Sequence, residues 1–398
     1  MLQIVLVNTY KVINSRGGTE KVFCELANAL SDCNFSVTAI CCDSESGYPA
    51  FPLSERVCFI NASNNKNIPL FSKGLFKKIR SLRFTKRSRE LNRKLIECEW
   101  MVPYIGKAIS KLGVVDLYIS FQPETTYILK GKLNINTPII TTFHGSPLSL
   151  MSNPAFDLYG KSINATQVLT VLMPSYVTLV KKNLKKVSVE YLPNAITNFQ
   201  NLSHLSEKKI VCVARLSNEK RVELLVQATA ILKKKYKDWR VEFWGEVNIN
   251  EKYKEKIFSL CDFLDVREQF RFCGETGSVE SVLDDAAIFA FPSSSEGFSL
   301  AVGEAMSKGI PVVGCRDCLF MNEIVKNGDS GFLVDPDPIT FSEALEKLMV
   351  DYDLRVRMGR TGKAIISEFE PHKIWNKWFE LIEKVLKQNK SESLSGND

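Results

Sequence analysis

Short apolar runs rich in β-branched residues alternate with longer amphipathic segments along most of this chain, and this alternation constrains its fold most strongly. Residues 2–7 form one such run, residues 8–18 are polar, and residues 20–30 then place apolar side chains three and four positions apart. The first spacing is typical of a buried strand and the last of an amphipathic helix. Repeated strand–helix units predict parallel sheets covered by helices.

The alternation occurs twice, and the turn-rich residues 193–206 separate the two runs. The first run predicts strands at residues 2–7, 35–41, 116–120, 138–143, 167–173 and 188–192. The second run predicts strands at residues 209–214, 240–244, 269–273, 287–291, 311–314 and 331–334, with a helix over 218–236. The predicted fold class is therefore α/β, with two doubly wound Rossmann-like domains facing a cleft.

The chain of 398 residues is long enough for two domains with full cores. We expect an N-terminal domain over residues 1–195 and a C-terminal domain over residues 196–370. A helix at about 371–386 is expected to pack back on the first domain, and the polar residues 387–398 are expected to be a disordered tail.

Composition excludes several classes of protein. The chain is 45% hydrophobic and 24% charged, which is typical of a soluble globular protein. No apolar run approaches the roughly 18 residues of a membrane span. Residues 1–7 lack a basic leader and a cleavage site, so we interpret them as a strand and not a signal peptide. The eleven cysteines have no framework spacing, which favours reduced thiols and a cytoplasmic location.

The segment IFAFPSSSEGFSLAVGEAMSKG, residues 288–309, carries the strongest chemical pattern. It predicts a strand, a loop of small residues and a helix that Ser299 caps. The backbone amides of residues 297–299 would then lie at a helix N-terminus, where anions bind. Glu296 precedes that point, and Glu304 lies roughly 7 Å further along the helix axis. Carboxylates at these positions suit the vicinal hydroxyls of a sugar or a ribose.

A second segment, IVCVARLSNEKRVE, places two cations near the start of a helix. The predicted strand delivers Arg215 at its carboxyl end, and Lys220 falls in the first turn of the helix that follows. An arginine fork and a mobile lysine charge suit the oxygens of a diphosphate.

Two shorter segments mark the N-terminal half. In RGGTE, Gly17 and Gly18 permit close approach of the backbone to a ligand, but the full G-x-G-x-x-G pattern of a dinucleotide site is missing. In TTFHGSP, His144 directly follows a predicted strand, which places it at the cleft edge of the first sheet.

Together these segments resemble retaining family 4 glycosyltransferases of the GT-B type. The Glu-x7-Glu spacing from Glu296 to Glu304, with GFS inside it and AMSKGIPVV after it, carries the likeness. The resemblance implies transfer of a hexose or N-acetylhexosamine from a nucleotide diphosphate sugar, with UDP favoured, to a saccharide or lipid-linked saccharide. It also implies retention of configuration, no cofactor and no metal, in bacterial lipopolysaccharide, O-antigen or capsule synthesis.

The resemblance further implies residue roles. Arg215 and Lys220 would hold the pyrophosphate, Glu296 would orient the donor sugar, and Glu304 would hold the ribose. His144 would touch the sugar from the N-terminal domain. The donor-binding set is Gly17, Gly18, Gly245, Gly274, Glu275, Gly297, Phe298, Ser299, Leu300 and Glu304. The acceptor is expected to meet Arg16 and Tyr10.

The likeness covers the C-terminal domain almost throughout, with departures. The segment FWGEV has Val247 where a second glycine is usual, and YLPNAI has Ala195 where glycine is usual. In the N-terminal domain only the glycine loop and the histidine strand match.

Residues 73–94 hold ten basic residues against one acid, Glu90, with apolar residues at near-helical spacing before residue 83. One interpretation is a solvated helix or loop. The other is a basic amphipathic helix on an anionic membrane surface, which would make the protein peripheral on the inner face of the cell membrane. Nucleic acid is a poor fit, because no stacking motif accompanies the charge.

Several alternatives stay open or are set aside. Asp335-Pro336-Asp337 matches a metal-binding Asp-x-Asp pattern, but we interpret it as a turn after a strand. Cys315 and Cys318 form a lone C-x-x-C, which is weak as a zinc or redox site. Rival functions are a nucleotide-sugar epimerase or a phosphorylase of the same fold, and a non-catalytic subunit that binds the sugar nucleotide.

Overall fold

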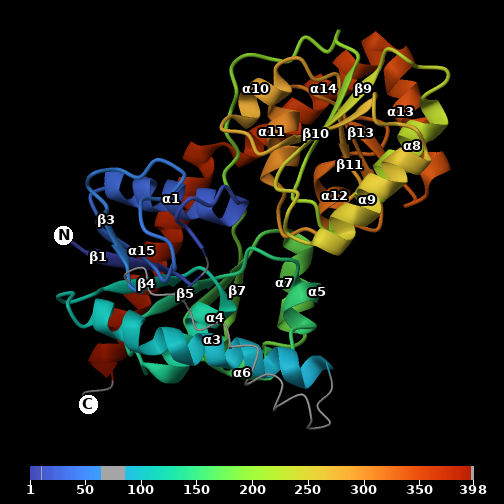
Figure 1. Cartoon of the computed structure of the whole chain (residues 1–398). Helices are drawn as coiled ribbons and strands as arrows, with labels where there is room; N and C mark the ends of the chain where they lie inside the picture. Colours follow the sequence, from blue (N-terminus) through green and yellow to red (C-terminus); the bar gives the residue numbers. More distant parts are fainter. Residues whose placement is uncertain (10, 64–85, 396–398) are drawn as a thin grey trace. The chain divides into compact units, whose positions relative to one another are not determined.

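The computed structural model describes residues 1–9, 11–63 and 86–395. It divides into two compact units: unit 1 is Met1–Pro193 with Ile374–Asp398, and unit 2 is Asn194–Lys373 (Figure 1). Each unit is a parallel sheet with helices packed on it, so the predicted two-domain Rossmann-like α/β fold is confirmed. The sequence placed the domain boundaries after residues 195 and 370.

Unit 1 contains a seven-stranded parallel sheet in the order β3-β2-β1-β4-β5-β6-β7. Its strands are β1 Gln3–Asn8, β2 Ser36–Cys41, β3 Cys58–Asn61, β4 Leu117–Ser120, β5 Ile139–Thr142, β6 Val168–Val171 and β7 Ser188–Tyr191. Both faces of the central strands are covered, which explains the continuous apolar runs. The sequence missed β3, because this short edge strand is only partly buried and has two large apolar residues.

The helical segments of unit 1 follow the strands closely. They are α1 Gly18–Asp32, α3 Lys86–Ile109, α4 Pro123–Thr126, the π-helical η1 Tyr127–Lys132, α5 Pro147–Met151, α6 Phe156–Ile163, α7 Pro174–Lys181 and α15 Pro371–Ser395. In α1, Phe23 is fully buried and meets Phe121 edge-on, with ring centroids 5.0 Å apart. The predicted helical face of residues 20–30 is thus the face that packs on the sheet.

The C-terminal helix α15 contacts the last strand of unit 1. Lys384 Nζ lies 2.9 Å from the Glu190 carboxylate of β7, and Lys377 lies over the Tyr191 ring. The expectation of a disordered tail from residue 387 is wrong as far as Ser395, because α15 continues to that residue. Lysine, glutamine and glutamate favour helix, and an ion pair joins Lys387 to Glu383 one turn earlier.

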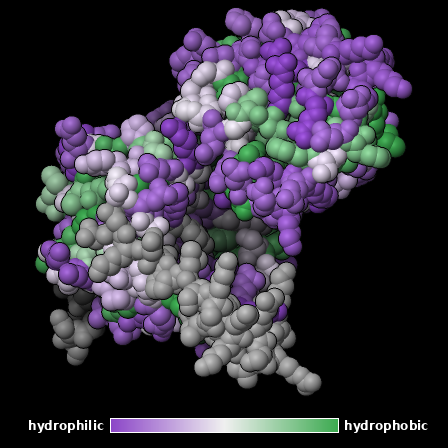
Figure 2. Space-filling view, in the orientation of Figure 1, coloured by the Kyte–Doolittle hydropathy of each residue, from purple (hydrophilic) through white to green (hydrophobic). Residues whose placement is uncertain are grey.

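Unit 2 contains a six-stranded parallel sheet in the order β10-β9-β8-β11-β12-β13. The strands are β8 Lys209–Val213, β9 Arg240–Trp244, β10 Phe270–Gly274, β11 Ile288–Phe291, β12 Val312–Cys315 and β13 Gly331–Val334. All six predicted strands of this half are present. The visible face of unit 2 is mostly hydrophilic, as expected when the apolar sides of the helices face the sheet (Figure 2).

The helical segments of unit 2 include one that the sequence placed differently. They are η2 Asn218–Lys220, α8 Val222–Leu232, α9 Glu251–Phe263, α10 Val279–Leu283, α11 Leu300–Ser307, α12 Leu319–Ile324, α13 Pro338–Val350, α14 Tyr352–Ile366 and η3 Ser367–Phe369. The single helix predicted over 218–236 is a 3-10 turn followed by α8, because Arg221 between them has a left-handed backbone (φ 48°, ψ 44°). Lys220 therefore lies in the turn and not in the helix.

Candidate functional site

The centre of the unit 2 sheet is a topological switch point. From β8 the chain continues to β9 and β10 on one side, and from β11 it continues to β12 and β13 on the other. Open α/β sheets bind ligands beyond the carboxyl ends of the strands at such a point. The two loops that leave it, residues 214–221 and 292–299, contain Arg215, Lys220 and Glu296.

Hydrogen bonds join these two loops directly. The carbonyl oxygen of Glu219 accepts from the Ser294 backbone N–H at 2.8 Å and from the Ser294 hydroxyl at 3.0 Å. The Ser293 hydroxyl oxygen also lies 3.3 Å from this carbonyl oxygen. Because Glu219 and Lys220 are adjacent, these bonds fix the position from which the Lys220 side chain leaves the loop.

The Lys220 ammonium forms an ion pair with the Glu296 carboxylate. The Ser293 hydroxyl donates to the same Glu296 Oε1 at 2.6 Å, and Lys220 Nζ lies 5.3 Å from the centroid of the Phe291 ring. The two side chains are only 13% and 11% exposed, so little water screens the pair. The sequence assigned these residues to separate parts of a ligand, and the structure brings them into contact.

Arg215 directly follows the loop's first residue and its side chain is exposed. Its charge acts on the neighbouring carboxylate of Glu219. Burial opposes ionisation of that carboxylate. A 2.6 Å hydrogen bond from Ser217, the Glu219 backbone amide, and the charges of Lys220 and Arg215 together lower its pKa. The loop thus combines an ionised acid with two cations.

Helix α11 begins where the sequence placed its cap. The Ser299 hydroxyl accepts from the Val302 backbone N–H at 3.4 Å. Gly297, Phe298, Ser299 and Leu300 are all buried. The Phe298 ring packs against Phe320 and Phe369, with centroids 5.3 and 5.4 Å apart, so this side chain anchors the loop from the inside. A role of the loop amides in anion binding stays a prediction.

Glu304 lies within α11 and is only 4% exposed. Its neighbour Gly303 faces Ile196, and a Cβ at that glycine would collide with the isoleucine side chain. The helix is therefore held close to the segment that starts unit 2. The proposed contact of Glu304 with a ribose stays a prediction.

Two glycines shape the ends of β9 and β10. Gly245 has φ +138°, and its N–H donates to the Gly274 carbonyl at 2.7 Å. A Cβ at Gly245 would collide with the carbonyl oxygen of Ala214, so only glycine fits where β8 and β9 end. Gly274 has φ +77°, and Glu275 beside it is exposed.

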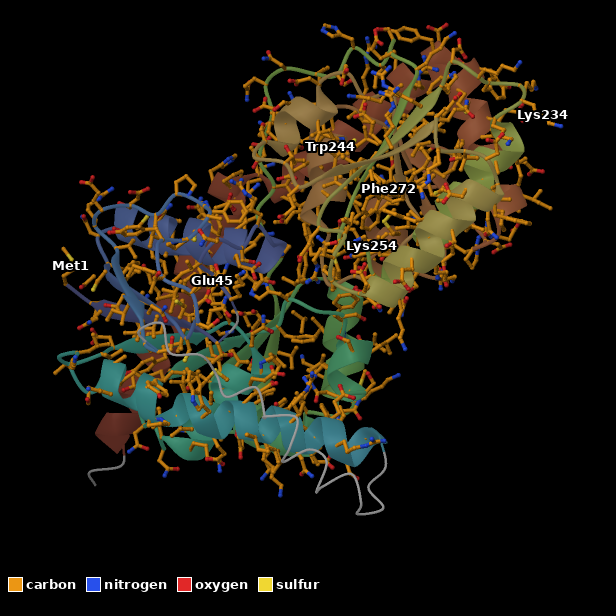
Figure 3. The ribbon with its side chains drawn as sticks, viewed as in Figure 1. Met1, Glu45, Lys234, Trp244, Lys254 and Phe272 are labelled. Atoms are coloured by element: carbon orange, nitrogen blue, oxygen red, sulfur yellow. The ribbon has the colours of Figure 1, made fainter. Side chains whose placement is uncertain are left out.

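The departure at Val247 has a structural reason. Val247 packs against the core of unit 2, and the preceding carbonyl, of Glu246, accepts the Leu216 N–H at 2.8 Å. An aromatic cluster lies under this region, where Phe272 of β10 contacts Phe243. The labels on Trp244 of β9, Phe272 of β10 and Lys254 of α9 mark this region in Figure 3.

In unit 1, the glycine loop precedes α1. Gly17 is the residue before the helix, with φ −78°, so its backbone angle does not require glycine. A Cβ there would meet only the Glu20 carboxylate, which is the end of a flexible side chain and can move away. Gly18 opens α1, and Arg16 is exposed. Tyr10, the other predicted acceptor residue, lies outside the described residues.

His144 lies two residues beyond β5, as its sequence context predicts. Its Nε2 forms a 2.9 Å hydrogen bond with the Thr142 hydroxyl, and its ring stacks on Phe121 at 5.0 Å and 15°. Phe121 directly follows β4, so two neighbouring strand ends orient the half-buried imidazole. Contact with a donor sugar stays a prediction.

Unit 1 also contains a cavity with charged lining residues that the sequence did not reveal. It has a volume of about 390 Å³ and lies beyond the carboxyl ends of β1 and β2, beside α3. Among its lining residues are Thr9, Asp43, Lys94 and Glu124. Lys94 and Glu124 form a 3.2 Å ion pair with side chains 19% and 11% exposed. These residues come from distant segments, so no local motif marks the cavity.

The Asp-x-Asp and C-x-x-C motifs, which the sequence offered as possible metal or redox sites, belong to a helix cap and to the buried core. The Asp337 carboxylate caps α13 by accepting the N–H groups of Ile339 and Thr340 at 2.9 and 3.1 Å, so the Asp-Pro-Asp segment is a turn into a helix. Cys315 and Cys318 are fully buried, and burial raises their thiol pKa values to about 12 and about 11. Both thiols are therefore neutral near pH 7.

Residues 73–85 of the basic run lie outside the described residues, and residues 86–94 begin α3. Arg87, Arg89 and Arg93 are exposed, and the first turn of α3 has no acid. No helix in the described part of the chain combines the length and apolar character needed to cross a bilayer.

Residues 195–365 match the family model described as glycosyl transferases group 1, and this range contains Arg215, Lys220, Glu296 and Glu304. The fold of the whole chain is similar to a mutant of S. aureus TarM solved with fondaparinux, α-GlcNAc-glycerol and UDP. The two share 15% identity and a TM-score of 0.77, over 96% of this chain and 99% of TarM. The family match and the GT-B fold together support a family-4-like glycosyltransferase.

Two curated relatives match nearly the whole length of this chain. An uncharacterized glycosyltransferase of Haemophilus influenzae is 26% identical over 92% of this chain and 96% of its own length. The amylovoran biosynthesis glycosyltransferase AmsD of Erwinia amylovora is 22% identical over 93% and 97%. Both comparisons include unit 1 as well as the matched unit 2.

Proposed function

We propose that this glycosyltransferase moves a hexose or N-acetylhexosamine from a UDP-sugar to a saccharide or lipid-linked saccharide of a bacterial surface polysaccharide, with retention of configuration. The Lys220–Glu296 pair at the β8/β11 switch point carries the proposal. The UDP in the TarM complex and the amylovoran role in the name of AmsD support the donor and the acceptor class.

The residues of unit 2 divide the work on the donor. Arg215 and Lys220 face the leaving diphosphate, together with the backbone amides before α11, where preorganised charge stabilises the transition state most. These groups supply the neutralising charge, so we propose that the reaction needs no metal. Glu304 takes the ribose, and the backbone at Gly274 meets the nucleobase.

Glu296 has two tasks in this proposal. Its carboxylate holds Lys220 in place before the donor binds. It then accepts hydrogen bonds from hydroxyls of the donor sugar. The acceptor hydroxyl attacks from the leaving-group face, and the departing phosphate oxygen takes its proton. His144 of unit 1 contacts the donor sugar, and the cavity lined by Lys94 and Glu124 takes part of the acceptor.

A donor screen tests the proposal. UDP-, GDP- and ADP-sugars are incubated with and without saccharide acceptors, nucleoside diphosphate release is measured, and NMR follows the anomeric configuration of the product. We expect release with a UDP-sugar and an α-product from an α-donor. Conversion of the sugar without an acceptor would identify an epimerase instead, and binding without turnover would identify a non-catalytic subunit.

Glu296→Gln is the variant that tests the site. We expect about a 10²-fold loss of kcat/KM, because the neutral amide neither pairs with Lys220 nor accepts hydroxyls as strongly. Glu346→Gln is the matched control, since Glu346 also accepts from a lysine, Lys235, at 2.6 Å but lies on α13. Full activity of Glu296→Gln would show that the site is assigned to the wrong residues.

We also propose that residues 73–94 attach the enzyme to the anionic inner face of the cell membrane. Arginines in the first turns of a helix oppose its dipole, so the exposed Arg87 and Arg89 do not stabilise α3. An anionic surface would compensate for both. Cosedimentation with phosphatidylglycerol vesicles should fall when Lys77, Lys78, Arg80 and Arg83 are neutralised. It should not fall in a Lys234→Gln control, which lies two residues beyond the end of α8 in unit 2. Equal binding of all variants would refute the attachment.

A further inference from the structure

Arg221 has a backbone conformation that its side chain disfavours. Its φ of 48° and ψ of 44° lie in the left-handed region, where a Cβ approaches the following carbonyl oxygen. Glycine, asparagine and aspartate adopt this region most readily. A long cationic residue needs support from elsewhere in the structure to stay there.

That support comes from Asp317. Arg221 Nη1 donates to Asp317 Oδ1 at 3.0 Å and Nη2 donates to Oδ2 at 2.6 Å, which is the two-pronged geometry that fixes a guanidinium in both position and orientation. The two side chains are 28% and 39% exposed.

The pair reaches across the end of a strand. Arg221 ends the loop after β8 and Asp317 lies in the loop after β12, whereas β11 lies between these strands in the sheet. Neighbouring strands are about 4.8 Å apart, so the pair spans about twice that distance. The loop that contains Glu296 follows β11. The Arg221–Asp317 pair therefore joins the loops on the two sides of the Glu296 loop.

Asp317 is itself held on a fixed loop. Arg316 Nη2 donates to the Leu333 carbonyl at 3.0 Å, and the Arg316 carbonyl accepts from the Asn322 side chain at 2.7 Å. These bonds tie the residues around Asp317 to β13 and to α12. Asp317 therefore acts as the stationary partner.

Arg221 connects the turn that contains Lys220 to the helix that follows. Its N–H donates to the Asn218 carbonyl at 3.2 Å, which closes the turn, and its own carbonyl accepts from Leu224 at 2.9 Å, which starts α8. A change of residue 221 to a right-handed conformation would redirect the preceding peptide. Lys220 would then leave its place beside Glu296.

We propose that Arg221 and Asp317 are positioning residues, which hold the left-handed turn that aims Lys220 at the diphosphate of the donor. This inference rests on the proposed function of Lys220. It names residues outside the predicted site, 96 positions apart in the chain.

A double-mutant cycle on nucleotide binding tests it. UDP, GDP and ADP are titrated calorimetrically into the full-length protein, and the best ligand is then used with Asp317→Asn, Lys220→Ala and the double variant. We expect Asp317→Asn to weaken binding about tenfold, and to have no further effect once Lys220 is absent. Asp262→Asn is the matched control, because Asp262 also forms a two-pronged pair, with Arg267 at 2.6 and 3.0 Å, but at the end of α9.

The outcomes separate the two proposals. If no nucleotide binds the unaltered protein, the proposed function is wrong and the positioning role falls with it. If nucleotide binds and Lys220→Ala weakens it, but Asp317→Asn acts equally in both backgrounds, the pair does not act through Lys220 and the inference is overturned. Loss of thermal stability in Asp317→Asn with unchanged affinity would likewise overturn it, since it would show a merely structural pair.

Discussion

Unit 1 and unit 2 place six strands in matching order, β3-β2-β1-β4-β5-β6 and β10-β9-β8-β11-β12-β13, so β1 corresponds to β8 and β4 to β11. The loops beyond these strands differ. In unit 2, hydrogen bonds through the Glu219 carbonyl join the two short loops that contain Arg215, Lys220 and Glu296. In unit 1, residues from several distant segments line the cavity.

Under the proposed function, this difference lets one topology serve two kinds of ligand. A diphosphate needs charges and amides at fixed spacing, which a strand–loop–helix segment supplies locally. An acceptor site needs a shape, and a shape can be assembled from any segments that the fold brings together. We therefore expect changes in unit 2 to affect the donor and changes in the unit 1 cavity to affect the acceptor.

The largest effect is expected at Lys220. Lys220→Ala should lower kcat/KM by about 10²–10³-fold, because it removes a charge that stabilises the leaving diphosphate. Steady-state kinetics with varied donor would measure this. Lys256→Ala, which breaks a 3.1 Å pair with Glu223 on the exposed surface, serves as the control. Comparable losses in both variants would indicate a general effect of charge and not a site.

The second effect concerns the backbone that supports the donor loops. Gly245→Ala should lower the free energy of unfolding by about 3 kcal/mol, because φ +138° and the Ala214 carbonyl both exclude a Cβ. Gly274→Ala has a positive φ but open space, so about 1–2 kcal/mol is expected. Urea denaturation followed by fluorescence measures the free energy of unfolding of both variants. An equal decrease in the two would show that the contact with Ala214 does not contribute.

The third effect tests unit 1 against unit 2. Glu124→Gln leaves Lys94 unpaired in the cavity and should raise the KM for the acceptor about tenfold, with the KM for the donor unchanged. Glu99→Gln breaks another lysine pair on α3, with Lys132, and should change neither value. A rise confined to the donor KM would break the proposed division between the units.

The smallest effect concerns thiol reactivity. Of the eleven cysteines only Cys33 and Cys58 are exposed, and both belong to unit 1. Burial raises the thiol pKa of Cys98 in unit 1 and of Cys212 in unit 2 to about 12, so these groups stay neutral at pH 8, where the thiolate is the reactive form. Titration of the folded protein with a thiol reagent should modify two cysteines rapidly. Rapid reaction of a buried unit 2 thiol, such as Cys212 or Cys261, would indicate that this unit opens.

Most strands could be predicted because buried parallel strands are continuous apolar runs. The pattern failed where a segment is half-exposed, as in β3, or where a single residue interrupts a regular helix, as Arg221 does. Helix propensity alone gives no sign of a left-handed arginine, since a partner far along the chain holds it there.

The candidate site divides in the same way. Ser299 and its helix were predicted because a cap is a local interaction. Ser293 was not singled out, although it lies in the same loop, because its bond to Glu296 depends on how the loop folds back. The cavity in unit 1 left no local trace, since Thr9 and Lys94 are brought together only by the sheet and α3.

By itself, the sequence determined two parallel sheets, the loops at their strand ends and the residue types needed for a nucleotide sugar. Periodicity, capping and strand–loop–helix geometry act over a few residues, so they can be read directly. Only the tertiary structure decided that Lys220 pairs with Glu296, 76 positions away, and that Arg221 meets Asp317. These contacts depend on which strands are neighbours at a switch point, and that order is set by the packing of the whole sheet.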